Sequence, residues 1–540
     1  MFPVIAFIAL IAWHQRVLES RRLAERAVDF YQRGIDRLED RWMGRGETGD
    51  RFLDPRHPYA GDLDLFGKGS LFELISTART RAGEATLASW LLTSASLAEI
   101  QSRQQAVAEL RDRLDLREDL ALLGENFRSG VHPEELAAWA AAPPVQFSAF
   151  TRVIALLLAA VGLALLYALF GVREAQPFIR SAIIVLALVE AAFVFRFRRI
   201  VRQSLGAVEH PGHDLALLSQ VLHRLEAERF SSPRLSQLRA ALNVAGQPAS
   251  RRISRLNRIV ELVDSRDNFF VRLFGPLLLW STQLTFALEE WRRISGPSVP
   301  QWLRAVGEIE ALSALAGYAY EHPNDPFAQF TGNGPEFRGD GLAHPLLPES
   351  RCVRNSVSLS PDLRLLVVSG SNMSGKSTLL RTVGVNAVLA MAGAPVRAKC
   401  LSMSPLTVGA SMRITDSLQD GSSRFYAEIT RLRSIVDLAG GANPLLFLLD
   451  ELLAGTNSHD RRIGAEAVVK GLVDRGAIGL VTTHDLALAH IAEALAPQAE
   501  NVHFEDTLED GKMRFDYRMR PGVVQKSNAL ELMRAVGLDV

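Results

Sequence analysis

The sequence predicts two kinds of structure: a mainly α-helical region interrupted by a pair of apolar helices, followed by a C-terminal α/β domain. Two observations lead to this prediction. Short, continuously apolar runs at residues 363–369, 445–449 and 478–483 alternate with helical patterns, as the buried strands of a parallel sheet do. Residues 153–172 are twenty successive uncharged residues, which is long enough for a helix that crosses a hydrocarbon layer.

Stretches rich in Gly, Pro, Ala, Asp or Asn mark the expected boundaries between the parts of the chain, at residues 44–58, 141–144 and 321–341. Together with the apolar runs they predict five parts. These are an apolar, membrane-proximal segment (1–61), the first part of a helical domain (62–149), a transmembrane hairpin (150–199), the second part of the helical domain (200–335) and the α/β domain (336–540).

The run Gly370–Ser377 fits the phosphate-binding pattern G-x-x-x-x-G-K-[ST] and lies between a predicted strand and a predicted helix. Gly370 and Gly375 can adopt the backbone angles that aim successive N–H groups at a phosphate. Lys376 would reach the outer phosphates of ATP, and the Ser377 hydroxyl would bind Mg²⁺. The expected nucleotide-binding residues are Gly370, Asn372, Met373, Gly375, Lys376, Ser377 and Thr378.

Two further strands end in polar residues. Residues 445–449 run into Asp450 and Glu451, and residues 478–483 run into His484. Parallel strands present their carboxyl ends at one edge, where ligands bind. Asp450 would hold Mg²⁺, Glu451 would act as general base for ATP hydrolysis, and His484 would sense the γ-phosphate. A strand that merely ends in a solvated turn has the same pattern, but the phosphate loop upstream favours the ATPase interpretation.

These residues resemble the ATPase domain of the MutS family, a branch of the ABC-type P-loop ATPases. The phosphate loop is similar to the family's G-P-N-M-G-G-K-S-T, and residues 416–428 resemble the family's signature loop. The elements that carry the likeness are Asn372 and Met373, then Ser423, Phe425 and Glu428, then Gly455–Asn457, and Thr482–His484. Weaker matches extend it over most of residues 62–135 and 300–540, including His344–Pro345, Asn355, Gly69–Ile75, Ala88–Leu92, Arg103–Leu110, residues 302–318, Asn501–His503 and Gly522–Ser527.

The resemblance implies an ABC-type ATPase domain that follows an all-α domain like the MutS core, with ATP and Mg²⁺ as its ligands. It also implies a homodimer in which Ser423 of one subunit completes the ATP site of the other in trans. Three departures from the family are expected. The first 61 residues contain no counterpart of the mismatch-reading domain, and no helix-turn-helix follows the ATPase before Val540. Arg424 and Cys352 stand where the family has a small hydroxyl residue and an adenine-stacking aromatic.

The apolar runs predict a membrane anchor. Residues 153–172 are the first expected span, and residues 181–195, which end in Arg196–Arg199, are the second, with a buried amphipathic helix as the alternative for this shorter run. Residues 2–13 are apolar but too short to span, so they form a half-inserted anchor or the true start lies upstream. Arginines follow both apolar regions, and the positive-inside rule places these flanks and the ATPase on the cytoplasmic side of the inner membrane.

Residues 269–288 are apolar enough to suggest a further membrane span, but Arg272, Gly275–Pro276 and Gln283 interrupt the run. A buried core helix is therefore favoured, with Phe286, Leu288 and Trp291 as packing residues. Two cysteines without metal-ligand spacing do not support a zinc site.

The formal net charge is zero, with 60 basic and 60 acidic residues, and the arginine runs at 196–202 and 251–258 are short. Duplex or branched DNA is therefore expected as a partner mainly from the resemblance. Two hypotheses follow: a membrane-anchored MutS-like ATPase that is associated with DNA and related to mismatch repair, or an ATP-driven conformational switch that acts on a membrane or envelope partner without DNA.

Overall fold

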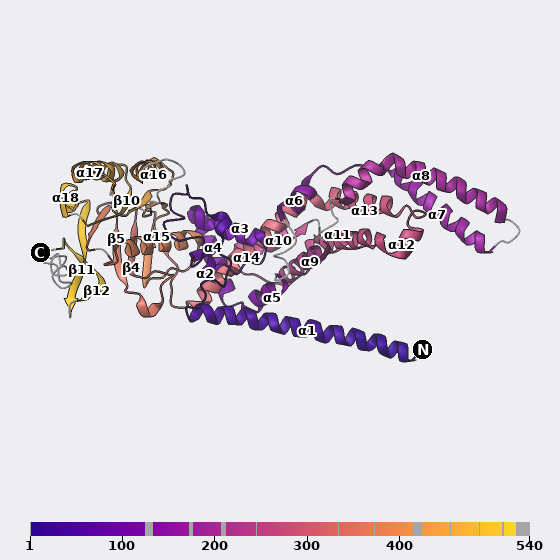
Figure 1. Ribbon diagram of the computed structural model, residues 1–540, viewed down its shortest axis with the longest axis horizontal. Coiled ribbons are helices and arrows are strands. Elements are labelled where there is room, and N and C mark those ends of the chain that lie inside the picture. The colour runs from indigo at the N-terminus through magenta and orange to yellow at the C-terminus, as the bar shows by residue number, and fades with distance from the viewer. Residues whose placement is uncertain are drawn as a thin grey trace. The chain divides into compact units, whose positions relative to one another are not determined.

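The computed structural model describes residues 2–524 except 125–132, 172–175, 207–211, 245, 333, 372, 414–423, 454, 485 and 510–511. Its internal contacts divide the chain into two compact units, each assembled from separate stretches of sequence. Unit 1 contains Met1–Thr77, Glu84–Leu114 and Ala311–Val540, and unit 2 contains Ala78–Gly83 and Asp115–Glu310. Figure 1 shows the elements of both units along the chain.

Unit 1 is built around a six-stranded sheet. Its strands follow the order β12-β11-β6-β10-β9-β8, and all neighbours are parallel except β12, which pairs antiparallel with β11. Every residue of β6, β9 and β10 is buried, as expected for parallel strands that are covered on both faces. The bounds are β6 Leu365–Ser369, β8 Thr407–Ser411, β9 Leu445–Leu449, β10 Ile478–Thr483, β11 Ala499–Glu509 and β12 Lys512–Pro521. The three strands predicted from apolar runs are thus confirmed.

Helices cover both faces of this sheet. The helix α15 (Lys376–Ala392) contacts strands of the six-stranded sheet and also β4 of a second sheet, so it lies between the two sheets. Helices α16 (Arg424–Leu438), α17 (Ser458–Asp474) and α18 (Leu486–Ala494) lie on the other face of the six-stranded sheet (Figure 1). Their apolar faces join a core centred on fully buried side chains that include Phe447 and Leu472.

The second sheet of unit 1 has the order β3-β7-β4-β5. Its strands are β3 Gln329–Phe330, β4 Phe337–Leu342, β5 Asn355–Leu359 and β7 Cys400–Met403. Helices α1 (Phe2–Leu38), α2 (Leu71–Ile75), α3 (Arg81–Leu92) and α4 (Leu97–Arg111) belong wholly or mostly to the same unit, with the end of α14 (Val299–Glu321). Arg37 near the end of α1 donates to both carboxylate oxygens of Glu321 in α14.

Unit 2 is helical, with one two-residue hairpin of strands, β1 (Asn243–Val244) and β2 (Gln247–Pro248). Within it α9 and α11 pack together, and α13 contacts α7, α8 and α11. Trp139 and Trp291 stack with ring centroids 6.1 Å apart. The helices are α5 Leu114–Gly124, α6 Pro133–Ala141, α7 Ala149–Gly171, α8 Gln176–Gly206, α9 Gly212–Ala227, α10 Pro233–Ala241, α11 Ala249–Asp264, α12 Phe269–Phe274, α13 Trp280–Ser295 and the first part of α14.

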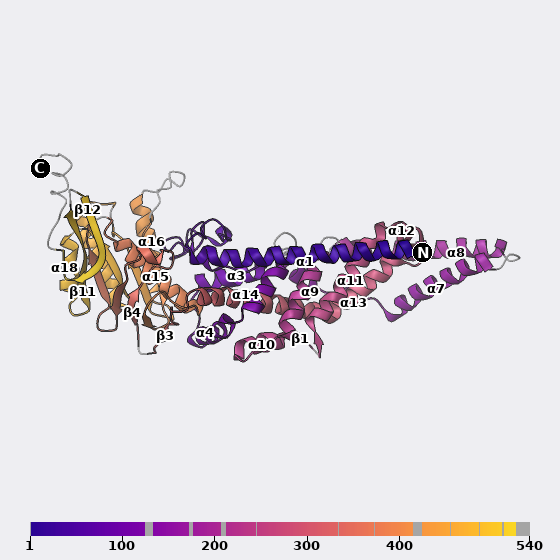
Figure 2. The ribbon, with the colours of Figure 1, turned by 90° about the horizontal axis from the view of Figure 1, so that it is seen from below.

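Two helices of unit 2 are long and apolar enough to cross a membrane, by length and composition. These stretches are Ala149–Leu169 in α7 and Pro177–Gly206 in α8, and each buries 11% of its most apolar window. Figure 2 shows α7 and α8 as neighbours, and many of their large apolar side chains are exposed, including Leu156, Leu163 and Leu188. These two helices therefore differ from buried core helices, because they leave large apolar side chains exposed.

The stretch 269–288, expected to be one core helix, is two helices instead. It breaks between Phe274 and Trp280, where Gly275 and Pro276 interrupt the apolar pattern. Phe286, Leu288 and Trp291 are buried in α13, which confirms their predicted packing role. Phe269 in α12 is exposed instead.

Candidate functional site

Three loops meet at the carboxyl edge of the six-stranded sheet. They follow β6, β9 and β10, which are parallel neighbours with β10 in the middle. The loops after β6 and β9 border a cavity of about 930 Å³ whose lining includes Met373, Gly375, Lys376, Ser377, Thr378, Asp450 and Glu451. The structure therefore brings most of the predicted nucleotide-binding residues together with both carboxylates. Asn372 and Ser423 lie outside the described residues.

The phosphate loop ends where α15 begins. Gly375 has φ 106°, in the left-handed region that favours glycine, and α15 starts at Lys376. Lys376 is only 5% exposed, and its Nζ donates to the carbonyl oxygens of Gly370 (2.9 Å) and Ser371 (2.8 Å). Burial lowers the pKa of Lys376, against the opposing effect of Glu451 and Asp450. A buried ammonium group at a helix N-terminus is chemically suited to bind phosphate oxygens.

The two carboxylates lie on a strained turn after β9. Glu451 and Leu453 have φ of 49° and 53°, conformations that cost free energy for residues other than glycine. The buried Thr482 at the end of β10 fixes this turn, because its hydroxyl accepts from the Glu451 N–H at 3.1 Å and donates to Asp450 Oδ1. The neighbouring strand β8 also contributes, since the Asp450 N–H donates to Ser411 O at 2.9 Å.

His484 reaches the general-base candidate. Its Nδ1 lies 3.4 Å from Glu451 Oε1, and its Nε2 lies 3.4 Å from Nη1 of Arg461 in α17. A guanidinium only donates, so His484 Nε2 is the acceptor and Nδ1 carries the proton that faces Glu451. Arg461 is buried and also donates to Leu452 O at 2.9 Å. No local sequence pattern indicates a role for Arg461, because an arginine near the polar start of a helix is common.

Residues of β5, β12 and the loop before β5 also line the cavity. Its lining includes His344, Cys352, Asn355 and Tyr517. The Asn355 amide donates to Tyr517 O at 2.9 Å and accepts from the Met519 N–H at 2.8 Å, so it fixes β12 beside the cavity. Burial lowers the pKa of His344 to about 4, which keeps its imidazole neutral. The family has an adenine-stacking aromatic residue at the position of Cys352. In this chain Tyr517 supplies an aromatic ring to the lining of the same cavity.

The donor set of this cavity fits Mg²⁺ bound with a nucleotide. Ser377 and Asp450 both line the cavity. The hydroxyl oxygen of Ser377 and a carboxylate oxygen of Asp450 are suitable ligands for Mg²⁺. Mg²⁺ at nucleotide sites takes one or two protein ligands and completes its shell with phosphate oxygens and water. Within the described part of the chain, no cluster of three or more His, Cys, Asp or Glu side chains forms another metal site.

Unit 2 carries two basic features outside this cavity. Arg251, Arg255 and Arg258 are exposed along one face of α11, at spacings of four and three residues. A second cavity, of about 780 Å³, borders the end of the apolar part of α8. Its lining includes Phe195, Arg198, Arg202, Arg266, Arg272 and Trp280.

Comparison with known proteins assigns the C-terminal domain to a protein family. Residues 366–539 match the family described as MutS domain V. The chain is similar to the DNA mismatch repair protein MutS of Natronomonas pharaonis, with 34% identity over 250 residues, covering 44% of this chain and 28% of that protein. It is also similar to the endonuclease MutS2 of Thermus thermophilus, with 32% identity over 248 residues, covering 44% of this chain and 31% of the relative.

The DNA mismatch repair protein MutS 2 of Halobacterium salinarum is 35% identical over 243 residues, covering 44% of this chain and 27% of that protein. The chain thus aligns with less than a third of the length of each of these three relatives.

Proposed function

We propose that this chain, whose residues 366–539 are a MutS domain V and hence an ABC-type ATPase domain, is a membrane-anchored homodimeric ATPase associated with DNA. One observation carries the ATPase part of the proposal. The phosphate loop after β6, the carboxylates after β9 and His484 after β10 border one cavity or contact its lining. The relatives' names speak of mismatch repair and of an endonuclease, which motivates DNA as the partner.

In the proposed mechanism, Lys376 and the N–H groups at the start of α15 bind the β- and γ-phosphates of ATP. Ser377 and Asp450 would hold Mg²⁺, which would supply neutralisation of charge on the phosphate oxygens. Glu451 accepts a proton from the attacking water. His484 contacts Glu451 and orients its carboxylate. Because Glu451 lies next to the attacking water, His484 is also placed to sense the γ-phosphate.

Ser423 is proposed to complete the site of the partner subunit in trans, as the resemblance implies. Symmetric dimers place the same residue at both sites, so each subunit supplies one phosphate loop and one Ser423. Within one subunit, Phe425 at the start of α16 lies beside Gly455 in the turn after Glu451.

The membrane part of the proposal rests on the exposed apolar surfaces of α7 and α8. The arginine-lined cavity at the end of α8 contains Phe195 and Trp280 as well, a combination of basic and aromatic side chains that is typical of a membrane–water interface. Anionic lipid headgroups are the partners this chemistry favours. The ATPase domain then faces the cytoplasm, where ATP is available.

A dye on the hairpin is expected to enter the lipid phase. Leu163→Cys in α7, in protein lacking Cys352 and Cys400, should give labelled protein whose fluorescence shifts to the blue and is quenched by brominated lipid in anionic vesicles. The matched control is Ile463→Cys in α17, also an exposed apolar position, where no quenching is expected. Equal exposure to water at both positions would refute insertion of the hairpin.

DNA should stimulate ATP hydrolysis in a salt-sensitive manner if the DNA part of the proposal holds. Each phosphate contact contributes about 0.9 to the slope of log K against log salt, so Arg251→Gln, Arg255→Gln and Arg258→Gln combined should reduce the slope by about three. The control replaces Arg338 and Arg433, which are exposed in unit 1. DNA binding over a series of salt concentrations measures this slope, and ATPase rates with duplex, mismatched and branched DNA at two salt concentrations measure the stimulation.

A flat response to DNA, with hydrolysis intact, would instead favour the second candidate function. The ATPase would then act as a conformational switch on a membrane or envelope partner, a function for which the exposed apolar hairpin is the specific supporting observation.

A further inference from the structure

The segment of residues 54–66, here named the strap, lies along the edge of the six-stranded sheet in unit 1. We propose that Asp62 in the strap is a positioning residue for ATP hydrolysis, because it holds the two elements that fix the turn carrying Asp450 and Glu451. These elements are the end of β8 and the helix α16. The inference rests on Glu451 acting as the general base, as proposed above.

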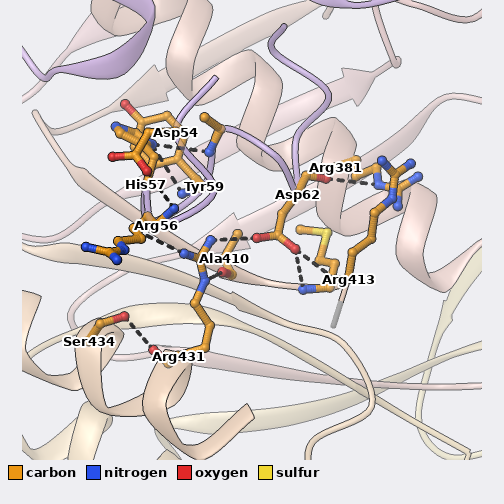
Figure 3. Close-up of polar contacts among 12 residues, drawn as sticks. Asp54, Arg56, His57, Tyr59, Asp62, Arg381, Ala410, Arg413, Arg431 and Ser434 are labelled. Atoms are coloured by element: carbon orange, nitrogen blue, oxygen red, sulfur yellow. Dashed lines mark hydrogen bonds and ion pairs between the residues drawn. The ribbon is translucent and has the colours of Figure 1, made fainter. Parts of the chain in front are cut away.

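Asp62 is 4% exposed, and both of its carboxylate oxygens accept hydrogen bonds from the ATPase domain. Oδ1 accepts from the backbone N–H groups of Met412 and Arg413, each at 2.8 Å, directly after β8. Oδ2 accepts from Nη2 of Arg431 in α16 at 2.7 Å. Figure 3 shows the carboxylate between these two sets of donors.

Arg431 in α16 uses all three of its guanidinium nitrogens to bind the strap and β8. Besides Asp62, its Nε donates to Ala410 O in β8 at 3.1 Å, and its Nη1 donates to Arg56 O in the strap at 3.3 Å (Figure 3). The strap also pairs with the edge strand directly, since the Ala410 N–H donates to Pro58 O at 2.8 Å. Strap, β8 and α16 are therefore tied at one point.

Both elements held by Asp62 continue to the catalytic turn. From β8, Ser411 O accepts from the Asp450 N–H. From α16, Glu428 lies one helical turn before Arg431 and is 2% exposed, and its carboxylate accepts from the Leu453 N–H. The turn between Asp450 and Leu453 is thus held at both ends by elements that Asp62 connects.

This turn depends on outside support because Glu451 and Leu453 both have positive φ. Strained conformations persist only where the surroundings over-determine them. A misplacement of about 1 Å of a catalytic group can cost on the order of 100-fold in rate. Loosening β8 or α16 should therefore lower the rate of hydrolysis more than it lowers ATP binding, which depends on the separate phosphate loop.

Asp64 provides a matched control in the same strap. It pairs with the side chains of Arg413 and Arg381, at 2.6 Å and 3.8 Å, and its own side chain is 31% exposed. The contacts described for Asp64 go to these side chains, whereas Asp62 accepts from the backbone after β8 and from α16. Only Asp62 therefore connects the backbone after β8 with α16, and this connection is what the proposed positioning role requires.

The test compares Asp62→Asn and Asp64→Asn for kcat, KM and thermal unfolding, with rates expressed per active site titrated with a fluorescent ATP analogue. Asp62→Asn is expected to reduce kcat about 10-fold with KM changed less than threefold, because one charged acceptor in a buried site is lost. Asp64→Asn should stay within twofold of the wild type in kcat. Arg431→Lys provides a second variant that retains the positive charge, and its kcat should fall less than that of Arg431→Met.

Two results would overturn the inference. One is an Asp62→Asn protein that unfolds at lower temperature but has wild-type kcat per active site, which would make Asp62 a purely stabilising residue. The other is an equal loss of kcat in Asp64→Asn. If Asp62→Asn does not fold, the comparison of Arg431→Lys with Arg431→Met decides by the same criteria. Assaying Glu451→Gln in parallel separates the two proposals, since wild-type activity there refutes the base assignment itself.

Discussion

Replacing Glu451 by glutamine is expected to lower kcat for ATP hydrolysis about 100-fold to 10,000-fold, the range that a general base contributes. Glutamine keeps the shape of the side chain but cannot accept the proton of the attacking water. ATP binding should be nearly unchanged, because Lys376 and the phosphate loop belong to β6 and α15. Steady-state hydrolysis and equilibrium binding of a fluorescent ATP analogue together check this expectation.

Glu466 offers a control for this variant, since it lies in α17 of the same domain and is exposed. Glu466→Gln should retain wild-type kcat. An unchanged rate in Glu451→Gln would remove Glu451 from the mechanism.

Replacing Lys376 by alanine is expected to weaken ATP binding about 100-fold or more. The reason is that charge-assisted hydrogen bonds contribute about 1.5–3 kcal/mol each, and this lysine would contact two phosphates. Its burial makes the effect larger than for a surface lysine, because charged hydrogen bonds are stronger where water is excluded. Titration with a fluorescent ATP analogue measures the loss, with Lys470→Ala in the exposed face of α17 as the control.

The same variant tests the composite site. Lys376→Ala and Ser423→Ala subunits are each expected to be inactive alone. A mixed dimer would contain one intact site, made of the phosphate loop of one subunit and Ser423 of the other. Random mixing gives half mixed dimers with one of two sites intact, so about a quarter of wild-type activity should return. No recovery after subunit exchange would argue against completion of the site in trans.

The parts of this molecule that could be predicted from the sequence are those encoded within a few residues. The apolar runs of β6, β9 and β10 and the glycines of the phosphate loop are local patterns, and they predict the parallel sheet and the edge where ligands bind. The length of α7 follows in the same way from uninterrupted apolar sequence, whereas α8 (Gln176–Gly206) extends well beyond the expected run 181–195.

Other features depend on residues that are distant in the chain and leave no local pattern. Asp62 and Arg431 are 369 residues apart, and each looks like an ordinary charged surface residue in its own segment. The position of Tyr517 in the cavity depends on the pairing of β12, which short-range periodicity does not specify. The break between α12 and α13 lies at Gly275 and Pro276, where a helix is interrupted although the apolar pattern continues on both sides.

The strap also bears on where this protein can be divided. A fragment starting at residue 336 would contain every residue of the proposed ATP site, yet β8 would become an open sheet edge. Arg431 would lose two of its three acceptors while Ala410 O remained, and the N–H of Ala410 would lose its strap partner. Unpaired edges and buried unpaired cations favour aggregation and misfolding. The ATPase domain therefore belongs to a larger folding unit, and the strap should accompany it during expression or transfer to another protein, together with Glu84–Leu114 and the residues from Ala311 onward, which lie in the same unit.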